Sequence, residues 1–238
     1  MSSEHIDRIR EIADQTWVRN FDASLGLSPF EQSKRSNDNL DLPALEYLLA
    51  DKPEHITHRT RPVEFEPELG IKMAVPEYEG NYGEIYNLSI SKGTLTTEER
   101  YKINEHMISG IKMLEALPFP PELSRVPRYA STHHETLKGT GYPRKLKAQD
   151  LLIPDRILAI ADIFEALTAA DRPYKKAKPV SVALDIMYKM ALDEHIDFDL
   201  FILFLESEVY LEYAHIFLPE SQLDPVNIQK YFRTTEIA

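Results

Sequence analysis

The stretch that decides the fold is His133-His134-Glu135-Thr136-Leu137-Lys138-Gly139-Thr140-Gly141-Tyr142-Pro143, in which two adjacent imidazoles precede a glycine-rich loop. We expect the histidines at the end of a helix over about 122–134, where consecutive side chains point about 100° apart. Neutral imidazole is the commonest metal ligand in proteins, and two such side chains can reach two different ions. Taken alone, the pair is better explained as two solvated histidines that favour the dipole at a helix C-terminus.

A helix is expected over about 97–117, upstream of this stretch, because Thr96-Thr97-Glu98-Glu99 supplies a cap and an acidic first turn. One face of it shares helical spacing, and its members are Ile103, His106, Met107, Gly110, Leu114 and Leu117. His106 is therefore expected to point inward, with Gly110 leaving room beside it. Two interpretations stay open: a core histidine bonded to a carbonyl, or a metal ligand.

Asp162 lies in the middle of a strongly apolar helix that we expect to begin at Pro154 and Asp155. A helix that is apolar nearly all round is predicted to be buried. Burying even a neutral polar group without a partner costs on the order of 2–7 kcal/mol. Asp162 is therefore expected to meet a cation, a metal or strong hydrogen-bond donors, and a metal ligand is the best of these explanations.

The amino-acid composition limits the class of protein, the donors of any metal site and the possible partners. The 238 residues include 8 glycines and no cysteine, and 43% are hydrophobic against 28% charged, as in soluble globular proteins. Any metal must therefore be held by nitrogen and oxygen. The net charge of −12 disfavours long nucleic acid as a partner. Without a signal peptide or an apolar run long enough to cross a bilayer, a cytoplasmic protein with no membrane segment is expected.

The remaining pattern predicts helices over 4–20, 42–49 and 180–193, with one or two more after His195. Residues 21–40 are expected to form a loop, and residues 52–82 an unusually long irregular connection. His55 and His58 lie in that connection, and we interpret them as surface residues. The expected organisation is an N-terminal region over 1–82, a helical domain over 83–218 and a polar tail over 219–238.

A basic turn follows the apolar helix, Asp171-Arg172-Pro173-Tyr174-Lys175-Lys176. It is either a solvated loop or an anion clamp, in which Arg172 gives bidentate contacts to a phosphate and Lys175 a point charge.

Several ordered motifs together resemble the HD-GYP family over roughly residues 83–217. They are His-His-Glu-x-x-x-Gly-x-Gly-Tyr-Pro, Ala-Asp-Ile-Phe-Glu-Ala-Leu-Thr and Asp-Arg-Pro-Tyr-Lys, preceded by Leu95-Thr96-Thr97-Glu98-Glu99, Glu105-His106 and Gly110. The resemblance implies an all-α, HD-type helical bundle, here with a long irregular N-terminal insertion. It also implies a divalent-metal centre, usually iron or manganese, that hydrolyses cyclic di-GMP.

The same resemblance implies roles for individual residues. The metal ligands would be His106, His133, His134 and Asp162. Arg172 and Lys175 would hold a phosphate of the ligand, and the loop of Gly139, Gly141 and Tyr142 would border it. No residue is assigned a catalytic role.

The sequence departs from the family pattern in two places. The His-Asp pair of the family occurs nowhere in the chain. The chain therefore resembles the C-terminal half of the module, with the family's insertion at 52–82 and with a protein partner or an upstream segment completing the metal site. Lys138 also stands where the family carries an acid, which changes the anchoring of the loop or adds a phosphate contact.

Three functions follow from these observations. The first is a metal-dependent cyclic di-GMP phosphodiesterase, of which this chain is a part. The second is a catalytically incomplete module that binds cyclic di-GMP or a protein partner. The third is another HD-type phosphohydrolase acting on a nucleotide, against which Tyr142-Pro143 argues.

Overall fold

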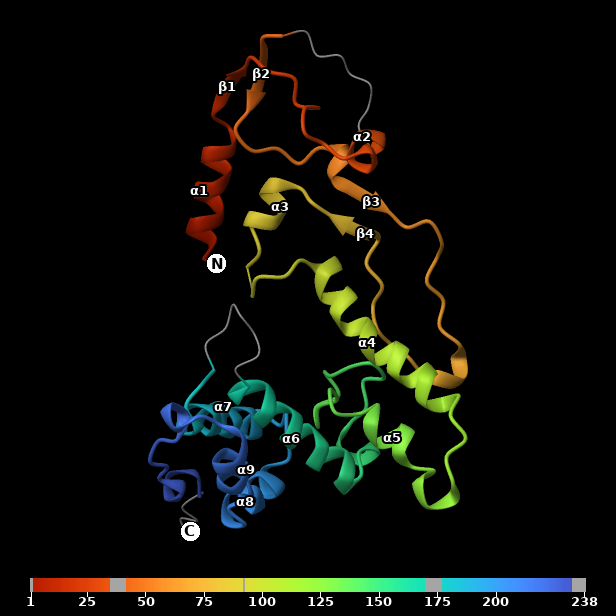
Figure 1. Cartoon of the computed structure of the whole chain (residues 1–238), viewed down its shortest axis with the longest axis vertical. Coiled ribbons are helices and arrows are strands. Elements are labelled where there is room, and N and C mark those ends of the chain that lie inside the picture. Colours follow the sequence, from red (N-terminus) through yellow and green to blue (C-terminus); the bar gives the residue numbers. More distant parts are fainter. Residues whose placement is uncertain (1, 35–41, 92, 170–176, 233–238) are drawn as a thin grey trace. The chain divides into compact units, whose positions relative to one another are not determined.

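A computed structural model describes residues 2–34, 42–91, 93–169 and 177–232 (Figure 1). The chain divides into two compact units. Unit 1 comprises residues 1–64 and 74–105, and unit 2 comprises residues 65–73 and 106–238. Within the described residues most regular structure is helical, and strands occur only as two antiparallel pairs. The expected all-α class is confirmed. None of the helices in the described ranges is long and apolar enough to cross a membrane.

Unit 1 begins with helix α1 (Ser3–Ala13), followed by a two-stranded sheet. Strand β1 (Thr16–Arg19) runs antiparallel to β2 (Ala44–Tyr47). Helix α2 (Pro29–Lys34) lies between them in the sequence. The pairing is reinforced by Arg19, which is 4% exposed and donates from Nε to Glu46 Oε1 over 2.6 Å.

The second sheet of unit 1 joins β3 (Ile56–His58) to β4 (Tyr78–Asn81), with an irregular register between Thr57 and His58. Helix α3 (Glu84–Leu88) follows β4. Its first turn is held by Asp51, whose Oδ1 accepts from the backbone amides of Ile85 and Tyr86. The carboxylate thus satisfies amides that a helix N-terminus leaves unpaired.

Four expectations for this region were wrong or incomplete. The helix over 4–20 ends at Ala13, and Trp17 lies in β1. The segment expected as a helix over 42–49 forms β2 instead. Partner strands override weak local propensity, since each strand supplies the hydrogen-bond ladder that the other needs. The expected loops over 21–40 and 52–82 contain α2 and the second sheet, respectively.

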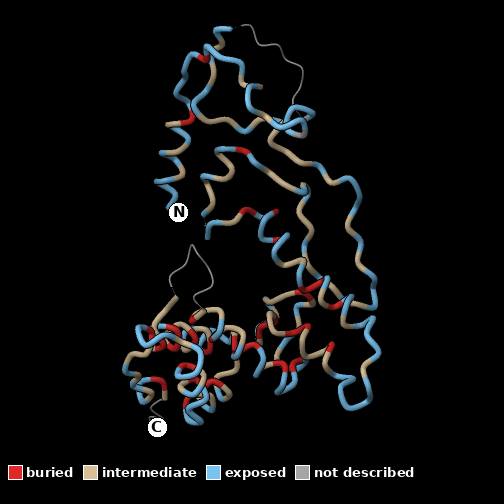
Figure 2. Tube along the Cα trace, in the orientation of Figure 1, coloured by how far each residue is buried: buried red, intermediate tan, exposed pale blue. Residues whose placement is uncertain are grey.

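Unit 2 holds the larger core. Its helices are the second part of α4 (Thr97–Glu115), α5 (Val126–Ala130), α6 (Ile153–Thr168), α7 (Val180–Leu192), α8 (Phe198–Glu206) and α9 (Val209–Phe217). The buried residues of Figure 2 gather where α6, α7, α8 and α9 meet. Phe201, Leu184 and Met187 are fully buried there, and Tyr231 joins them at 1% exposure. The Tyr231 hydroxyl donates to Asp185 on α7 over 2.9 Å.

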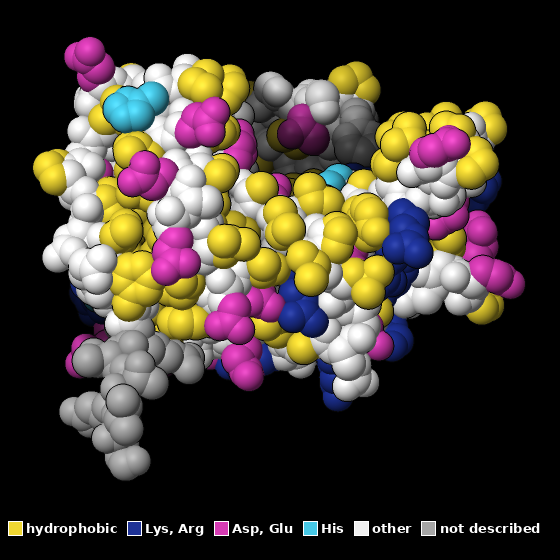
Figure 3. Space-filling view, turned by 90° about the horizontal axis from the view of Figure 1, so that it is seen from below, with side chains coloured by type: hydrophobic (Ala, Val, Ile, Leu, Met, Phe, Trp, Pro, Cys, Tyr) yellow, Lys and Arg dark blue, Asp and Glu magenta, His cyan; other side chains and the backbone are white. Residues whose placement is uncertain are grey.

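Helix α6 was expected to be buried all round, and this expectation was wrong. Ile160 and Phe164 face the core, but Ile157 is 48% exposed and Leu158 is 40% exposed. Seen from below, the molecule presents many apolar side chains at its surface (Figure 3). The helix therefore buries one face against α7 and α8 and leaves an apolar stripe on the other.

Candidate metal centre

His133 and His134 lie in a turn after α5, not in a helix over 122–134 as expected, because α5 ends at Ala130. Two hydroxyls compete for its last carbonyls. Ser131 donates from Oγ to the carbonyl of Arg128 over 3.0 Å, and Thr132 Oγ1 lies 3.0 Å from the carbonyl oxygen of Tyr129. Such local bonds offer the backbone an alternative to the helical ladder. The turn that follows presents both imidazoles.

Three imidazoles converge in unit 2. One ligand atom from each of His106, His133 and His134 lies within 4.8 Å of the other two. The ring centroids of His133 and His134 are 4.3 Å apart, and that of His106 is 5.2 Å from His134. Three imidazoles at this separation are a donor set suited to a divalent metal ion. They come from α4 and the turn after α5.

His106 is exposed, so the expectation that it points into the core was wrong. The buried apolar residues on the unit 2 part of α4 are Met107, Ile108 and Ile111, whereas Leu117, just past the helix, is 50% exposed. A Cβ added at Gly110 would meet nothing within 4 Å, so this glycine leaves open space. The apolar face is rotated away from the expected one, which leaves His106 at its edge beside the other two histidines.

His133 is oriented by the backbone. Its Nδ1 lies 2.8 Å from the carbonyl oxygen of Ala130. A carbonyl can only accept, so Nδ1 carries the hydrogen, and Nε2 is the ring nitrogen left to face a cation. A hydrogen bond from the second ring nitrogen to a carbonyl fixes the tautomer and the ring orientation in the way that metal-ligating histidines commonly show.

His134 is held in its neutral form. Burial, which is the largest cause, and the neighbouring His133 and His106 together lower its pKa to about 4, while Asp162 opposes the shift. Its Nδ1 lies 4.0 Å from Oδ2 of Asp162. An imidazole that is neutral at pH 7 has a lone pair available for a cation.

Asp162 is not buried, which corrects the premise that singled it out. Its side chain is 39% exposed, because it lies at the uncovered side of α6. It lies beside His134 but outside the group of three imidazoles. Asp162 and His133 both line a cleft of about 630 Å³, whose other walls include Leu158, Phe204 and Tyr213. The structure therefore brings Asp162 close to the histidines, although the burial argument for it fails.

The buried acid of α6 is Asp155, at 1% exposure, which the sequence analysis used only as a helix start. Its Oδ1 accepts from Thr132 Oγ1 over 2.7 Å, and its Oδ2 accepts from the amide of Leu152 over 2.8 Å. Because Thr132 directly precedes His133, this buried bond ties the first turn of α6 to the histidine turn. Asp155 is the third residue of α6 as observed, a position from which an acidic side chain accepts from the amide of the N-cap residue.

Glu135 closes the loop that follows the histidines. It is 2% exposed, and its two oxygens accept from the amides of Arg144 at 2.7 Å and Leu146 at 2.9 Å. Burial raises its pKa, and these backbone bonds oppose the rise. Arg144 has a structural role, because its guanidinium donates to the carbonyl of Leu69 and to Ser131 Oγ.

The glycines of the loop are required by geometry. Gly139 has φ +75°, a conformation that favours glycine. A Cβ at Gly141 would lie 2.4 Å from the carbonyl oxygen of His134 and 2.5 Å from Cα of Glu135. This close packing brings Tyr142 onto His134, where burial raises the pKa of the phenol to about 12 and keeps it protonated.

Lys138 anchors the loop: its Nζ donates to Oδ1 of Asp193 over 2.5 Å. Arg172 and Lys175, expected to hold a phosphate, lie outside the described residues. His55 and His58, expected at the surface, lie in unit 1. There the amide of Lys52 donates to Nδ1 of His55, and His58 packs edge-on against Tyr78.

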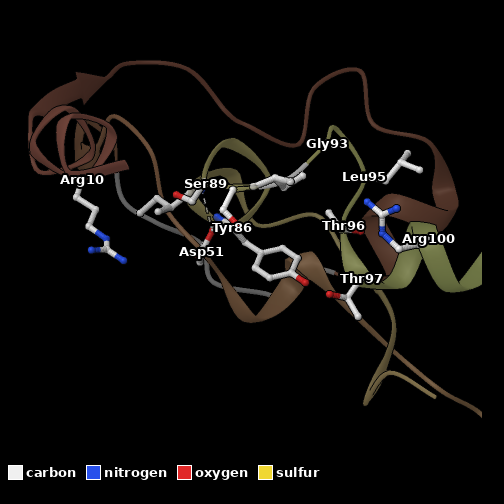
Figure 4. A pocket seen from close by; sticks show the side chains of 12 residues that line it. Arg10, Asp51, Tyr86, Ser89, Gly93, Leu95, Thr96, Thr97 and Arg100 are labelled. Carbon is white, nitrogen blue, oxygen red and sulfur yellow. Dashed lines mark hydrogen bonds between the residues drawn. The ribbon is translucent and has the colours of Figure 1, made fainter. Parts of the chain in front are cut away.

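Unit 1 has a cavity of its own, of about 980 Å³ (Figure 4). Asp51 and Tyr86 lie in its middle, and Arg10 of α1 and Arg100 of α4 lie at opposite ends of the view. Asp51 is already engaged with the amides that begin α3. Among the described residues, none of those predicted from the sequence to form the site lines this cavity.

The fold and the site together define a class of protein: helical bundles with a candidate divalent-metal site, here three imidazoles beside an open cleft. A family model described as HD domain matches residues 43–200, which is more than half of the chain. The chain therefore belongs to the HD-domain family, and the expected HD-type fold is confirmed.

The curated relatives described next are named as phosphodiesterases of cyclic dinucleotides. The chain is 36% identical over 114 residues to a cyclic di-GMP phosphodiesterase of Thermotoga maritima, covering 48% of this chain and 30% of that protein. It is 32% identical over 119 residues to the cyclic di-GMP phosphodiesterase response regulator RpfG of Xanthomonas campestris, covering 50% and 31%. A 3'3'-cGAMP-specific phosphodiesterase of Vibrio cholerae is 50% identical over 60 residues, covering 25% and 13%. The chain thus spans less than a third of each of these relatives.

Proposed function

We propose that this chain carries the metal-binding and ligand-facing part of a metal-dependent phosphodiesterase that acts on cyclic di-GMP. The observation that carries the proposal is the convergence of His106, His133 and His134 beside Tyr142 of the glycine loop. Several relatives are named as cyclic di-GMP phosphodiesterases, which supports cyclic di-GMP as the substrate.

The proposed ligand set is these three histidines together with Asp162. Nitrogen and oxygen donors of this kind suit iron or manganese. The fit rests on His133, whose Nδ1 bond to Ala130 leaves Nε2 as the donor, and on His134, which is neutral. When bound, a divalent cation polarises a phosphodiester and stabilises the charge that develops on its oxygens.

The chain's own residues have proposed roles around the ligand. The Tyr142 hydroxyl stays protonated and donates a hydrogen bond to a phosphate oxygen. Gly139 and Gly141 shape the loop that carries Tyr142, Gly139 through its positive φ and Gly141 through its close packing on residues 134–136. Arg172 and Lys175 are proposed to hold the second phosphate, by bidentate and point-charge contacts respectively.

A second candidate function is a module that binds cyclic di-GMP without hydrolysing it. Two observations favour it. The group of three histidines includes no carboxylate among the described residues, and the sequence contains no His-Asp pair. A metal ion that lacks some of its ligands is bound more weakly, because fewer bonds hold it and the remaining ligands are less well oriented.

Metal analysis combined with a turnover assay distinguishes the two candidates. Two or more transition-metal ions per chain, with conversion of cyclic di-GMP to the linear dinucleotide, would establish the phosphodiesterase. Tight binding of cyclic di-GMP without turnover would establish the binding module, and neither metal nor binding would exclude both. Asp162→Asn is expected to lose metal, whereas Asp199→Asn, at an exposed position in α8, is the matched control.

A further inference from the structure

Lys138 of the glycine loop is held by a counter-ion at the C-terminal end of α7. Its partner Asp193 is the C-terminal cap of α7, and the Nζ to Oδ1 distance is 2.5 Å. Helix C-termini favour cations, so a carboxylate at this cap is not explained by the helix itself. It is explained by the ammonium that it binds.

The bond is exposed and therefore exchangeable. The side chain of Asp193 is 71% exposed and that of Lys138 is 39% exposed. Exposed ion pairs contribute little to stability, because water screens them and two long side chains must be ordered. A second anion that reaches Lys138 competes with Asp193 on nearly equal terms.

The loop that carries Lys138 also contacts the imidazole cluster. Lys138 comes four residues after His134 and four before Tyr142, in the loop that folds back onto His134.

We propose that Lys138 is a ligand-binding cation, held ready by Asp193 and transferred to a phosphate when the cyclic dinucleotide binds. This inference rests on the proposed function, because it takes the phosphodiester as the incoming anion. A phosphate that draws Lys138 away releases the loop from α7 at the same moment. Lys138 then contributes to affinity, and Asp193 reduces it by competing.

The proposed role and a simple tether predict opposite effects on ligand affinity when the Asp193 carboxylate is removed. If the pair only holds the loop in place, removing either partner weakens ligand binding to the same degree. If Asp193 competes with the phosphate, removing the carboxylate strengthens binding, whereas removing the ammonium weakens it. The double variant then behaves like the Lys138 variant, since no cation remains to be released.

The test is a double-mutant cycle on the full chain as purified, with its metal, using cyclic di-GMP as the probe and calorimetry to measure Kd. We expect Lys138→Gln to weaken binding about fivefold, Asp193→Asn to tighten it about threefold, and the double variant to match Lys138→Gln. Lys138→Arg keeps the charge and is expected to stay within about threefold of the native chain. Lys145→Gln removes an exposed cation of the same loop and is the matched control.

Weaker binding by Asp193→Asn would overturn the inference in favour of a tether. Equal weakening by Lys145→Gln would overturn it in favour of general attraction by positive charge. If the native chain binds cyclic di-GMP and all variants bind alike, the inference fails and the proposed function stands. If the native chain binds none, both fail. Melting followed by circular dichroism checks that each variant is folded.

Discussion

The phenol ring of Tyr142 is stacked on the imidazole of His134, with the ring centroids 4.7 Å apart and the planes inclined by 23°. The amide of Tyr142 also donates to the carbonyl of His134 over 3.2 Å. Side chain and backbone of one residue therefore both join the glycine loop to the second histidine. Changes that displace the loop should displace the candidate metal centre with it.

Gly141→Ala should disrupt this junction. Its Cβ would lie within 2.7 Å of three backbone atoms in residues 134–136, and backbone cannot move aside as a flexible side chain can. We expect a loss of about 2 kcal/mol in unfolding free energy, as for overpacking, together with reduced metal content. Chemical denaturation and elemental analysis measure the two effects.

Gly110→Ala is the control for that change. The added Cβ meets nothing within 4 Å, and the residue lies inside α4. Alanine is the better helix former by about 1 kcal/mol, so the melting temperature should stay the same or rise. Equal destabilisation by both substitutions would contradict the packing argument.

Glu135→Gln tests the buried carboxylate that closes the loop. The native side chain accepts two backbone amides, whereas an amide group offers only one oxygen and directs its NH₂ at the other donor. A cost of about 2 kcal/mol is expected from the donor left unsatisfied. Denaturation curves measure it, and Glu122→Gln, at an exposed position, should change the unfolding free energy by less than about 0.5 kcal/mol.

Thr132→Val removes the hydroxyl that bonds to Asp155 while keeping the side-chain shape. Both residues are buried, so one carboxylate oxygen loses a hydrogen bond without gaining water. We expect a loss of about 2 kcal/mol, and weaker metal retention because His133 is the next residue. Thr94→Val, at an exposed site in unit 1, should leave both quantities unchanged.

The low pKa of His134 makes the metal-free chain sensitive to acid. The folded chain binds this proton only near pH 4, whereas the unfolded chain binds it near pH 6.5. Between these values the unfolded state holds more protons, so stability falls as the pH is lowered from 6.5 towards 4. After allowance for solvent screening, the contribution is about 2 kcal/mol.

His134→Gln isolates that contribution from other acid-sensitive groups. The native and variant chains should differ in the slope of unfolding free energy against pH inside this window and run parallel above it. Denaturant titrations at a series of pH values, with chelator present, supply the curves. Parallel curves throughout would show that His134 titrates normally.

Much of the helical part could be predicted from periodicity. The expected helices over 97–117 and 180–193 match α4 and α7 closely, because long amphipathic segments carry the clearest signal. The expected short helix over 42–49 failed, since a four-residue strand is decided by its partner and not by its own residues.

The candidate site was reached partly for the wrong reason. His133 and His134 lie close to His106, and the role of the three as metal ligands stays a prediction. The burial argument for Asp162 failed, because an apolar helix was taken to be covered on all sides. The supporting bonds of Glu135 and Asp155 were missed. Their partners are backbone amides and a hydroxyl brought together by folding, and no pattern of residue types marks them.

The uncovered stripe on α6, with Ile157 and Leu158 beside the exposed Leu203 of α8, has a practical consequence. Dyes that become fluorescent on apolar surface should bind the native chain before any heating, as they do in molten globules. A strong dye signal at low temperature would then be a property of the folded protein, and dye-based melting curves would understate its cooperativity.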